Sequence, residues 1–157
     1  MQIALLSLDD LAATQRLGLF LANHLQAGDI VALEGGLGAG KSELARAIIR
    51  HLCPDEDDIP SPTFTLVQTY EPETMPQLLH FDLYRLETPE DAFALGIEDA
   101  FVDSICLIEW PERLGPYLPT TALKVSLAMT DGGESQRRVT IDGPESWQAR
   151  LSGLITI

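Results

Sequence analysis

The chain has few basic residues, and this shortage limits the partners that it can meet directly. Its 157 residues include 24 aspartates and glutamates but only 10 lysines and arginines, which gives a formal net charge of −14. Lys41 and Lys124 are its only lysines. A surface of this charge repels nucleic acid, so we expect no DNA binding, and contact with RNA only through a partner protein that supplies a basic surface. The charge can equally serve solubility alone.

Long apolar runs and closely spaced cysteines are also missing. No segment approaches the roughly 20 apolar residues that cross a membrane, and the N-terminus lacks the basic region and long apolar core of a signal peptide. Cys53 and Cys106 lie far apart and form no C-x-x-C motif, which indicates reduced thiols. We therefore expect a cytoplasmic protein without membrane association. Its length predicts a single domain over residues 1–157.

Glycine, by contrast, is concentrated in residues 34–42, which read EGGLGAGKS. This stretch fits the phosphate-loop pattern G-x-x-x-x-G-K-[ST]. Its fixed positions are Gly35, Gly40, Lys41 and Ser42. Glycines let backbone N–H groups converge on phosphate oxygens without steric clashes, the lysine reaches the β- and γ-phosphates, and the serine hydroxyl ligates Mg²⁺. The stretch therefore predicts a nucleotide site.

The residues on either side of this loop support that interpretation. Residues 30–33 are a short apolar run, which predicts a buried parallel strand. Residues 42–52 place their apolar side chains on one stripe, which predicts a helix that ends before Pro54. The N-terminus of such a helix carries a partial positive charge that favours phosphate. A glycine-rich turn with a chance GKS sequence would not require both neighbours.

Two further strands are expected to end in carboxylates. Residues 78–82 and 105–109 are apolar runs whose last residues are Asp82 and Glu109. The second run has the form of a Walker B strand, with glutamate in place of the commoner aspartate. In a doubly wound sheet, the carboxyl ends of the strands line the ligand crevice. We therefore expect both acids to face the phosphates, although a single acid at a strand end is usually only a turn residue.

A hydroxyl group could join these acids from residues 61–65, which read SPTFT. Thr63 lies just before a β-rich run at residues 64–70 that predicts a strand. Its hydroxyl could then face the γ-phosphate or Mg²⁺. Local chemistry alone favours another interpretation, in which a Ser-Pro turn simply leads into an edge strand.

The remaining pattern predicts an α/β fold. Further strands are expected at residues 2–6, 123–128 and 137–141, the last two as an antiparallel pair. Further helices are expected from an N-cap at Ser7 to about residue 25, at residues 89–95 with Gly96 as a cap, and at residues 145–151, with a turn-rich connector at residues 111–118.

Four blocks of sequence occur in one order along the chain. They are the phosphate loop, SPTFTLV at residues 61–67, HFDLYRL at residues 80–86 and IEWPE at residues 108–112. Together they resemble the bacterial TsaE family, whose older name is YjeE. The phosphate loop alone is not specific, whereas the last two blocks beside it are, and the resemblance covers essentially the whole chain. It implies the ATPase of N6-threonylcarbamoyladenosine synthesis in tRNA.

The resemblance also implies a fold, ligands and a partner. The implied fold is a P-loop NTPase-like parallel sheet with flanking antiparallel strands and surrounding helices. The implied ligands are ATP or ADP with Mg²⁺. The implied partner is the TsaB–TsaD complex, in which TsaD transfers threonylcarbamoyl to tRNA and which the ATPase would reset between turnovers. Contact with tRNA would then be only indirect.

The resemblance further assigns roles to individual residues. Asp82 would assist hydrolysis as the catalytic residue, and Ser42 and Glu109 would hold Mg²⁺. Leu11, at the start of the first helix, and Arg137 would meet the adenine, with Arg138 as an alternative because the sequence does not fix the hairpin register. The nucleotide-binding set is Leu11, Gly35, Leu37, Gly38, Ala39, Gly40, Lys41, Ser42, Glu43 and Arg137.

Two loop positions depart from the family pattern. Gly36 stands where the family usually has aspartate, and Glu43 stands where a second hydroxyl residue is common. The charge of Glu43 suits a helix N-terminus but would lie close to the α-phosphate. We therefore expect these departures to affect the tightness of nucleotide binding and not the existence of the site.

Three other functions use a phosphate loop. A small-molecule kinase would need an arginine-rich lid, yet only Arg137 and Arg138 are adjacent among the eight arginines. A GTPase would need an N-K-x-D box, and the only asparagine is Asn23. A non-enzymatic nucleotide sensor would release no phosphate. For the ATPase, Arg85 is the nearest candidate for an arginine finger, so we expect slow hydrolysis by the protein alone and faster hydrolysis in the complex.

Overall fold

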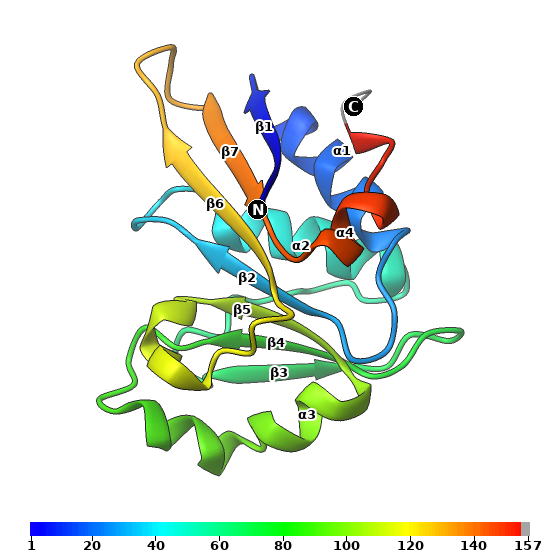
Figure 1. Cartoon of the computed structure of the whole chain (residues 1–157), viewed down its shortest axis with the longest axis vertical. Helices are drawn as coiled ribbons and strands as arrows, with labels where there is room; N and C mark the ends of the chain where they lie inside the picture. Colours follow the sequence, from blue (N-terminus) through cyan, green and yellow to red (C-terminus); the bar gives the residue numbers. More distant parts are fainter. Residues whose placement is uncertain (155–157) are drawn as a thin grey trace.

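The computed structural model describes residues 1–154, and its seven strands form one mixed sheet (Figure 1). The strands are β1 (Gln2–Leu8), β2 (Ile30–Glu34), β3 (Val67–Tyr70), β4 (Leu78–Asp82), β5 (Ile105–Glu109), β6 (Leu123–Met129) and β7 (Arg137–Asp142). The helices are α1 (Leu11–Ala22), α2 (Lys41–Leu52), α3 (Ile97–Asp103) and α4 (Glu145–Arg150), with 3₁₀ helices η1 (Pro89–Leu95) and η2 (Pro111–Tyr117). The predicted α/β class is confirmed.

The middle of the sheet is parallel and both of its sides are antiparallel. The strand order is β1-β7-β6-β2-β5-β4-β3. Strand β2 pairs in parallel with β5 and β6, and β4 pairs in parallel with β5. Strands β7 and β1 add to one side and β3 adds to the other, each antiparallel to its neighbour. This confirms the parallel sheet with flanking antiparallel strands, and the predicted 123–128/137–141 pair is part of it.

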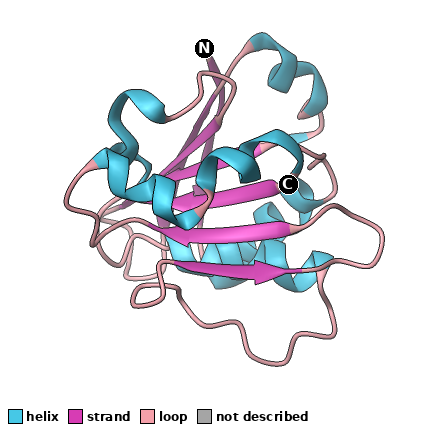
Figure 2. Cartoon of the chain, turned by 90° about the horizontal axis from the view of Figure 1, so that it is seen from below, coloured by secondary structure: helices cyan, strands magenta, loops and turns pink. Residues whose placement is uncertain are grey.

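The sheet separates two apolar cores, with helices on both of its faces (Figure 2). In β2, Val31 and Leu33 belong to the core with α1, α2 and α4, while Ile30 and Ala32 belong to the core with η1, α3 and η2. This division follows from the alternation of side chains along a strand. It also explains why β2 is a continuous apolar run, since a central parallel strand is buried on both faces. The central strands are therefore packed on both faces, which fixes the positions of their carboxyl ends.

Helices α1 and α2 lie in close contact, and a glycine permits this. A Cβ added at Gly18 would lie 2.5 Å from the Cβ of Ala47, a separation that real atoms do not reach. On the sheet side, Leu17 and Leu44 are fully buried, and truncation of such a leucine costs about 2–5 kcal/mol. The pair of helices is thereby fixed on the sheet, with the N-terminus of α2 at the carboxyl end of β2.

Several element boundaries differ from the prediction, and helix α1, for example, ends at Ala22 and not near residue 25. Two other differences have identifiable reasons. Strand β1 continues through Ser7, so Asp10 caps α1 instead, and its Oδ1 accepts a hydrogen bond of 2.9 Å from the amide of Ala13. Strand β3 begins at Val67, later than predicted, because Leu66 has a φ of 70°. This left-handed conformation cannot continue an extended strand. Residues 63–66 therefore form a turn, and the Ser-Pro turn interpretation was the better one for the backbone.

Two helical segments were not predicted. Gly96 ends η1 in the left-handed conformation, with a φ of 75°, as expected of a cap. Helix α3 then begins directly after it, because the same glycine also serves as the N-cap of the next helix. The expected connector at residues 111–118 is mostly the 3₁₀ helix η2. The sequence signals for short helices at these turn-rich positions were too weak to separate them from loops.

Within residues 1–154, no helix combines the length and the apolar character that a membrane span needs. Cys53 and Cys106 both have free, buried thiols, in agreement with the expected reduced state. Burial raises the pKa of the Cys106 thiol to about 12. Cys106 therefore packs in the core as an unreactive apolar side chain.

Candidate nucleotide site

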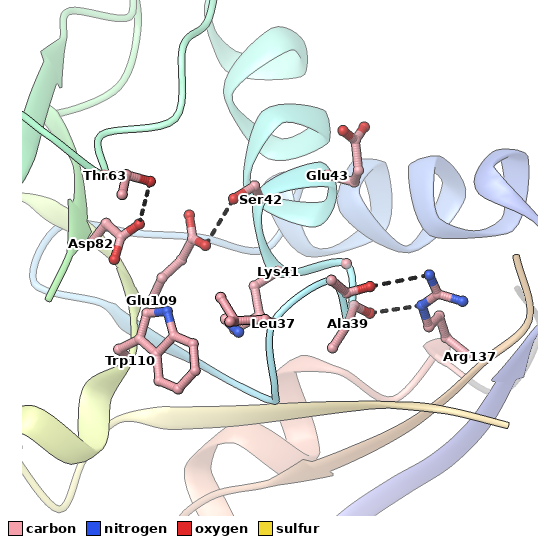
Figure 3. Close-up of a pocket in the computed structure, with 12 residues that line it drawn as sticks. Leu37, Ala39, Lys41, Ser42, Glu43, Thr63, Asp82, Glu109, Trp110 and Arg137 are labelled. Atoms are coloured by element: carbon pink, nitrogen blue, oxygen red, sulfur yellow. Dashed lines mark hydrogen bonds between the residues drawn. The ribbon is translucent and has the colours of Figure 1, made fainter. Parts of the chain in front are cut away.

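A cavity of about 310 Å³ lies over the phosphate loop, at the carboxyl ends of β2, β4 and β5 (Figure 3). Its walls come from the loop, the first turn of α2, the turn before β3, the ends of β4 and β5, and the start of β7. The residues that line it are Leu37, Gly38, Ala39, Gly40, Lys41, Ser42, Glu43, Thr63, Asp82, Glu109, Trp110 and Arg137. The structure thus brings nearly all of the predicted site residues to one place.

Two of the motif glycines are required by the shape of the loop. Gly35 has a φ of 146°, and a Cβ at this position would lie 2.5 Å from the carbonyl oxygen of Leu127. Gly40 has a φ of 106° and is the N-cap of α2. A Cβ at Gly36 would meet nothing within 4 Å, so the loop can accept a side chain there. The departure from the family pattern at Gly36 therefore has no steric cause in this fold.

The side chain of Lys41 is folded back onto its own loop. It is 5% exposed, and its Nζ donates hydrogen bonds to the carbonyl oxygens of Gly35 at 2.5 Å and Gly36 at 2.8 Å. The ammonium also lies 4.1 Å from the centroid of the Trp110 ring, a cation–π contact. Burial lowers the pKa of Lys41, while Glu109 and other nearby carboxylates act in the opposite direction. Lys41 is thus a buried amine at the wall of the cavity.

Ser42 and Glu109 meet at the base of the cavity. The Ser42 hydroxyl, in the first turn of α2, donates a 2.8 Å hydrogen bond to Oε1 of Glu109, at the end of β5 (Figure 3). Glu109 is 3% exposed, and its Oε2 lies 2.6 Å from Nε2 of His80 in β4. Because the serine proton points at the carboxylate, the lone pairs of the serine oxygen remain free to ligate a cation.

Asp82 lies beside Glu109 at the end of β4, where the two residues are register partners. It is 4% exposed. Its Oδ2 accepts a 3.0 Å hydrogen bond from the hydroxyl of Thr63, and its Oδ1 accepts a 3.1 Å bond from the amide of Tyr84. The Thr63 hydroxyl also lies 2.9 Å from that of Ser61. Thr63 therefore lines the cavity, where its hydroxyl contacts the carboxylate that was predicted to be catalytic.

The two residues expected near the adenine are placed differently. Arg137 lines the cavity, and its guanidinium donates to the carbonyl oxygens of Ala39 at 2.9 Å and Gly38 at 3.2 Å (Figure 3). Leu11 begins α1, is half exposed and does not line the cavity. Arg138 is exposed and does not line it either. Of the two candidate arginines, the hairpin register thus brings Arg137 to the phosphate loop.

Glu43 lines the cavity at the first turn of α2, but its carboxylate is engaged elsewhere. Its Oε1 accepts a 2.5 Å hydrogen bond from Arg46, one turn further along the helix. Both side chains are solvent-accessible, so this ion pair contributes little stability. It nevertheless offsets part of the negative charge that Glu43 brings to the cavity.

The donor set fits a Mg²⁺–nucleotide complex better than a free metal ion. In the part of the chain that the structure describes, no group of three or more histidine, cysteine, aspartate or glutamate side chains could enclose a metal. Mg²⁺ is usually held by one or two protein oxygens together with substrate phosphates and water. The hydroxyl of Ser42 and the carboxylate of Glu109 supply such a pair at the N-terminus of α2.

Two residues of this site are absent from the predicted binding, metal and catalytic residues. Trp110 directly follows Glu109 and covers Lys41, and it is only partly exposed. His80 is fully buried and contacts Glu109. Alternation along β4 did place His80 on the same face as Asp82, but only the pairing of β4 with β5 brings it to Glu109. That pairing cannot be deduced from residue patterns within one strand.

The chain matches the family model described as "Threonylcarbamoyl adenosine biosynthesis protein TsaE" over residues 8–139. It is 38% identical over 142 residues to the "tRNA threonylcarbamoyladenosine biosynthesis protein TsaE" of Rickettsia felis, covering 90% of this chain and 82% of that protein. It is 40% identical over 144 residues to the protein of the same name from Nostoc sp., covering 88% and 86%.

A solved structure agrees with the fold. The crystal structure of Bacillus subtilus YdiB superposes with a TM-score of 0.78 and covers 99% of this chain and 95% of that one, at 24% sequence identity. At this identity the match concerns the fold alone. The family model and the sequence relatives carry the assignment, and they show that the chain belongs to the TsaE family.

Proposed function

We propose that the protein is a Mg²⁺-dependent ATPase that acts in threonylcarbamoyladenosine synthesis in tRNA, together with the TsaB–TsaD complex. The observation that carries the ATPase proposal is the Ser42–Glu109 contact at the base of a glycine loop with the required backbone shape. Membership of the TsaE family supports the pathway. The partner follows from the four sequence blocks that resemble the family.

The charges around the cavity support a requirement for a metal. Asp82 and Glu109 are buried at its wall, and Lys41 and Arg137 are the cations among its lining residues. Two buried carboxylates beside a polyphosphate repel it strongly at low effective dielectric. Bound Mg²⁺ would neutralise charge on the phosphates. Ser42 and Glu109 would hold it, while the loop amides and Lys41 would bind phosphate oxygens.

Asp82 is the carboxylate left over for the hydrolysis step. Its oxygens are fixed by Thr63 and by the amide of Tyr84, so it can orient a water molecule and accept a proton from it at the cavity wall. Positioning and charge neutralisation are the main contributions that a protein makes to phosphoryl transfer. We therefore propose Asp82 as the group that positions the attacking water.

Slow hydrolysis by the isolated protein follows from the arginines of the site. Arg137 is the arginine among the lining residues, and its guanidinium already donates to carbonyl groups of the loop. Arg85 instead lies 5.5 Å from the ring of Phe64 and does not line the cavity. An arginine that stabilises the transition state can raise the rate by about 10³–10⁵. We expect the protein complex to complete the site.

The test is a phosphate-release assay on the purified protein with Mg²⁺ and ATP, with and without TsaB–TsaD. We expect slow release alone, faster release in the complex, and multi-turnover tRNA modification only when this chain is present. GTP competition and a search for phosphorylated metabolites separate the ATPase from a GTPase or a small-molecule kinase. Absence of phosphate release even in the complex would contradict the proposal and favour a non-enzymatic nucleotide sensor.

A further inference from the structure

His80 is a fully buried polar side chain in the middle of the apolar strand β4. Its Nε2 lies 2.6 Å from Oε2 of Glu109. Its Nδ1 is also buried, and it has no hydrogen-bond partner among the described residues. The hydrogen bonding of this ring is therefore directed at a single group, the carboxylate that also accepts from Ser42.

Packing does not explain a histidine at this position. On the same face of the sheet, Leu78 in β4 and Leu107, the register partner of His80 in β5, are fully buried apolar side chains. A buried polar nitrogen without a partner costs about 1–3 kcal/mol, which a leucine or phenylalanine would avoid. The contact that distinguishes histidine from an apolar residue here is the one to Glu109.

The need for this contact arises from the identity of the acid. A glutamate side chain has one more rotatable bond than the aspartate that is commoner at the end of a Walker B strand, so it loses more conformational entropy when it is fixed. Asp82 is fixed by a backbone amide two residues away. Glu109 has each of its two oxygens held by a side chain, Oε1 by Ser42 and Oε2 by His80.

We propose that His80 is a positioning residue for the metal, which holds Oε2 of Glu109 so that Oε1 faces Ser42 and the cavity. This inference rests on the proposed function, in which Ser42 and Glu109 hold Mg²⁺. Partners that orient metal ligands in this way are typically worth about 10–100-fold in metal affinity. Because a carboxylate only accepts hydrogen bonds, we assign the proton to Nε2 of His80 from the bonding network.

The first test compares His80→Gln with His80→Asn. The amide nitrogen of glutamine reaches about as far as Nε2 and can donate to Glu109, whereas that of asparagine stops near Nδ1, which has no partner. The measurement is calorimetric binding of a non-hydrolysable ATP analogue at several Mg²⁺ concentrations and without Mg²⁺. We expect His80→Asn to weaken the apparent Mg²⁺ affinity about 10–100-fold, His80→Gln to stay near wild type, and Mg²⁺-free binding to change little in both.

Two outcomes of this comparison would overturn the inference about His80 and leave the proposed metal site intact. One is a wild-type Mg²⁺ affinity in His80→Asn, and the other is an equal loss in both variants, as expected of a merely structural residue. In a Glu109→Gln background, His80→Asn should have little further effect, because interacting residues are not additive; full additivity would count against it as well. Wild-type binding that does not depend on Mg²⁺ would instead overturn the proposed metal site, and this inference with it.

A second measurement reads the protonation of the His80 ring in the wild-type protein. Long-range ¹H–¹⁵N spectra of the histidine-labelled wild-type protein report which ring nitrogen carries the proton in each of its three histidines. His80→Gln identifies the His80 signals by their disappearance. We expect a proton on Nε2. A proton on Nδ1 with a bare Nε2 would overturn the inference, because His80 could not then donate to Glu109.

Discussion

Asp82 and Glu109 end adjacent parallel strands and are register partners, yet the protein holds them in different ways. Glu109 is held between the first turn of α2 and a side chain in the middle of β4, so both of its contacts come from regular elements. Asp82 is held by the hydroxyl of Thr63, which lies in a turn, and by a local backbone amide. One carboxylate is fixed by the core, and the other depends on a surface segment.

That surface segment is exposed and conformationally unusual. Phe64, directly after Thr63, is 83% exposed. Leu66 adopts a left-handed conformation that is unfavourable for a residue with a Cβ, and its carbonyl accepts from the amide of Asp82 at 2.9 Å. Segments with few buried contacts open at lower free energy than the core. We therefore expect the position of Glu109, the proposed metal ligand, to be constant, whereas the position of Asp82, the proposed catalytic residue, depends on the turn at residues 63–66.

Lys41→Ala should have the largest effect, because Lys41 serves both halves of the site. The substitution removes the cation that we propose binds the phosphates, whichever carboxylate is in place. We expect phosphate release to fall to background, a larger loss than the ~10²–10⁴-fold typical of a single proton acceptor. The melting temperature should change little, since the hydrogen bonds of Nζ go to carbonyl groups of its own loop and its further contact is with the ring of Trp110. Wild-type turnover in a well-folded variant would contradict the phosphate-loop assignment.

Asp82→Ala should give the next largest loss and tests the catalytic half of the comparison. A group that positions the attacking water is worth about 10²–10⁴-fold in rate, while ADP affinity should remain nearly intact. Thr63→Ala is the matched control, because it leaves the carboxylate in place and removes only one of its hydrogen bonds. We expect a smaller rate loss there.

The competing view is that Asp82 only caps the turn toward Tyr84, whose amide donates to it. It predicts lost stability without a direct effect on catalysis. Melting temperature, ADP affinity and phosphate release on one preparation of Asp82→Ala separate the two views. A destabilised protein whose folded fraction hydrolyses ATP at the normal rate would remove Asp82 from the mechanism.

Glu109→Gln tests the metal half. The amide keeps the shape but loses the charge, so we expect the affinity for Mg²⁺–ATP to fall by about 10–100-fold while Mg²⁺-free ADP binding changes less. Glu109 accepts from both Ser42 and His80, and an amide has one oxygen. With that oxygen toward His80, the amide nitrogen faces the hydroxyl of Ser42, which can accept a hydrogen bond in place of donating one. The unfolding free energy should therefore fall by less than the ~1–3 kcal/mol of an unpaired buried donor. Equal losses in both binding measurements would indicate a structural role alone.

The sequence predicted the parts of this site that lie within one motif or one strand. The spacing of Gly35, Gly40, Lys41 and Ser42 specified the loop, and the apolar runs that end in Asp82 and Glu109 specified two strand ends. These features need no knowledge of strand order, because a phosphate loop and a strand end each have a local signature. The parallel sheet brings the carboxyl ends of these strands to one edge, which places the loop and the two acids together.

Contacts between elements could not be predicted in this way. The contact of His80 with Glu109 depends on the pairing of β4 with β5. The approach of Arg137 to the phosphate loop likewise depends on β6, which lies beside β2 and carries the β7 hairpin. The late start of β3 was missed because the left-handed conformation of Leu66 has no glycine to signal it.

Trp110 should give the smallest effect, a change of fluorescence and not of rate. Its ring lies 4.1 Å from Nζ of Lys41, which in this structure is bonded to the carbonyls of Gly35 and Gly36. These bonds engage two of the three N–H donors of the ammonium, so a phosphate is reached either with the third donor or by movement of the ammonium. The electrostatic environment of the indole then changes, so emission from Trp110 should shift or change in intensity when ADP binds.

The second tryptophan must be removed to isolate this signal. Trp147 is 3% exposed in α4, and its Nε1 donates a 2.9 Å hydrogen bond to the carbonyl of Thr121. Trp147→Phe removes this hydrogen bond, so the melting temperature of the variant should be checked. In this background, nucleotide should change the emission of Trp110. Adding Lys41→Ala should reduce the change measured at saturating nucleotide, because the cation over the ring is gone. If the emission of the Trp147→Phe protein with Lys41 intact does not change at saturating nucleotide, Lys41 does not move on binding. The folded-back conformation is then the one that Lys41 keeps in the nucleotide complex.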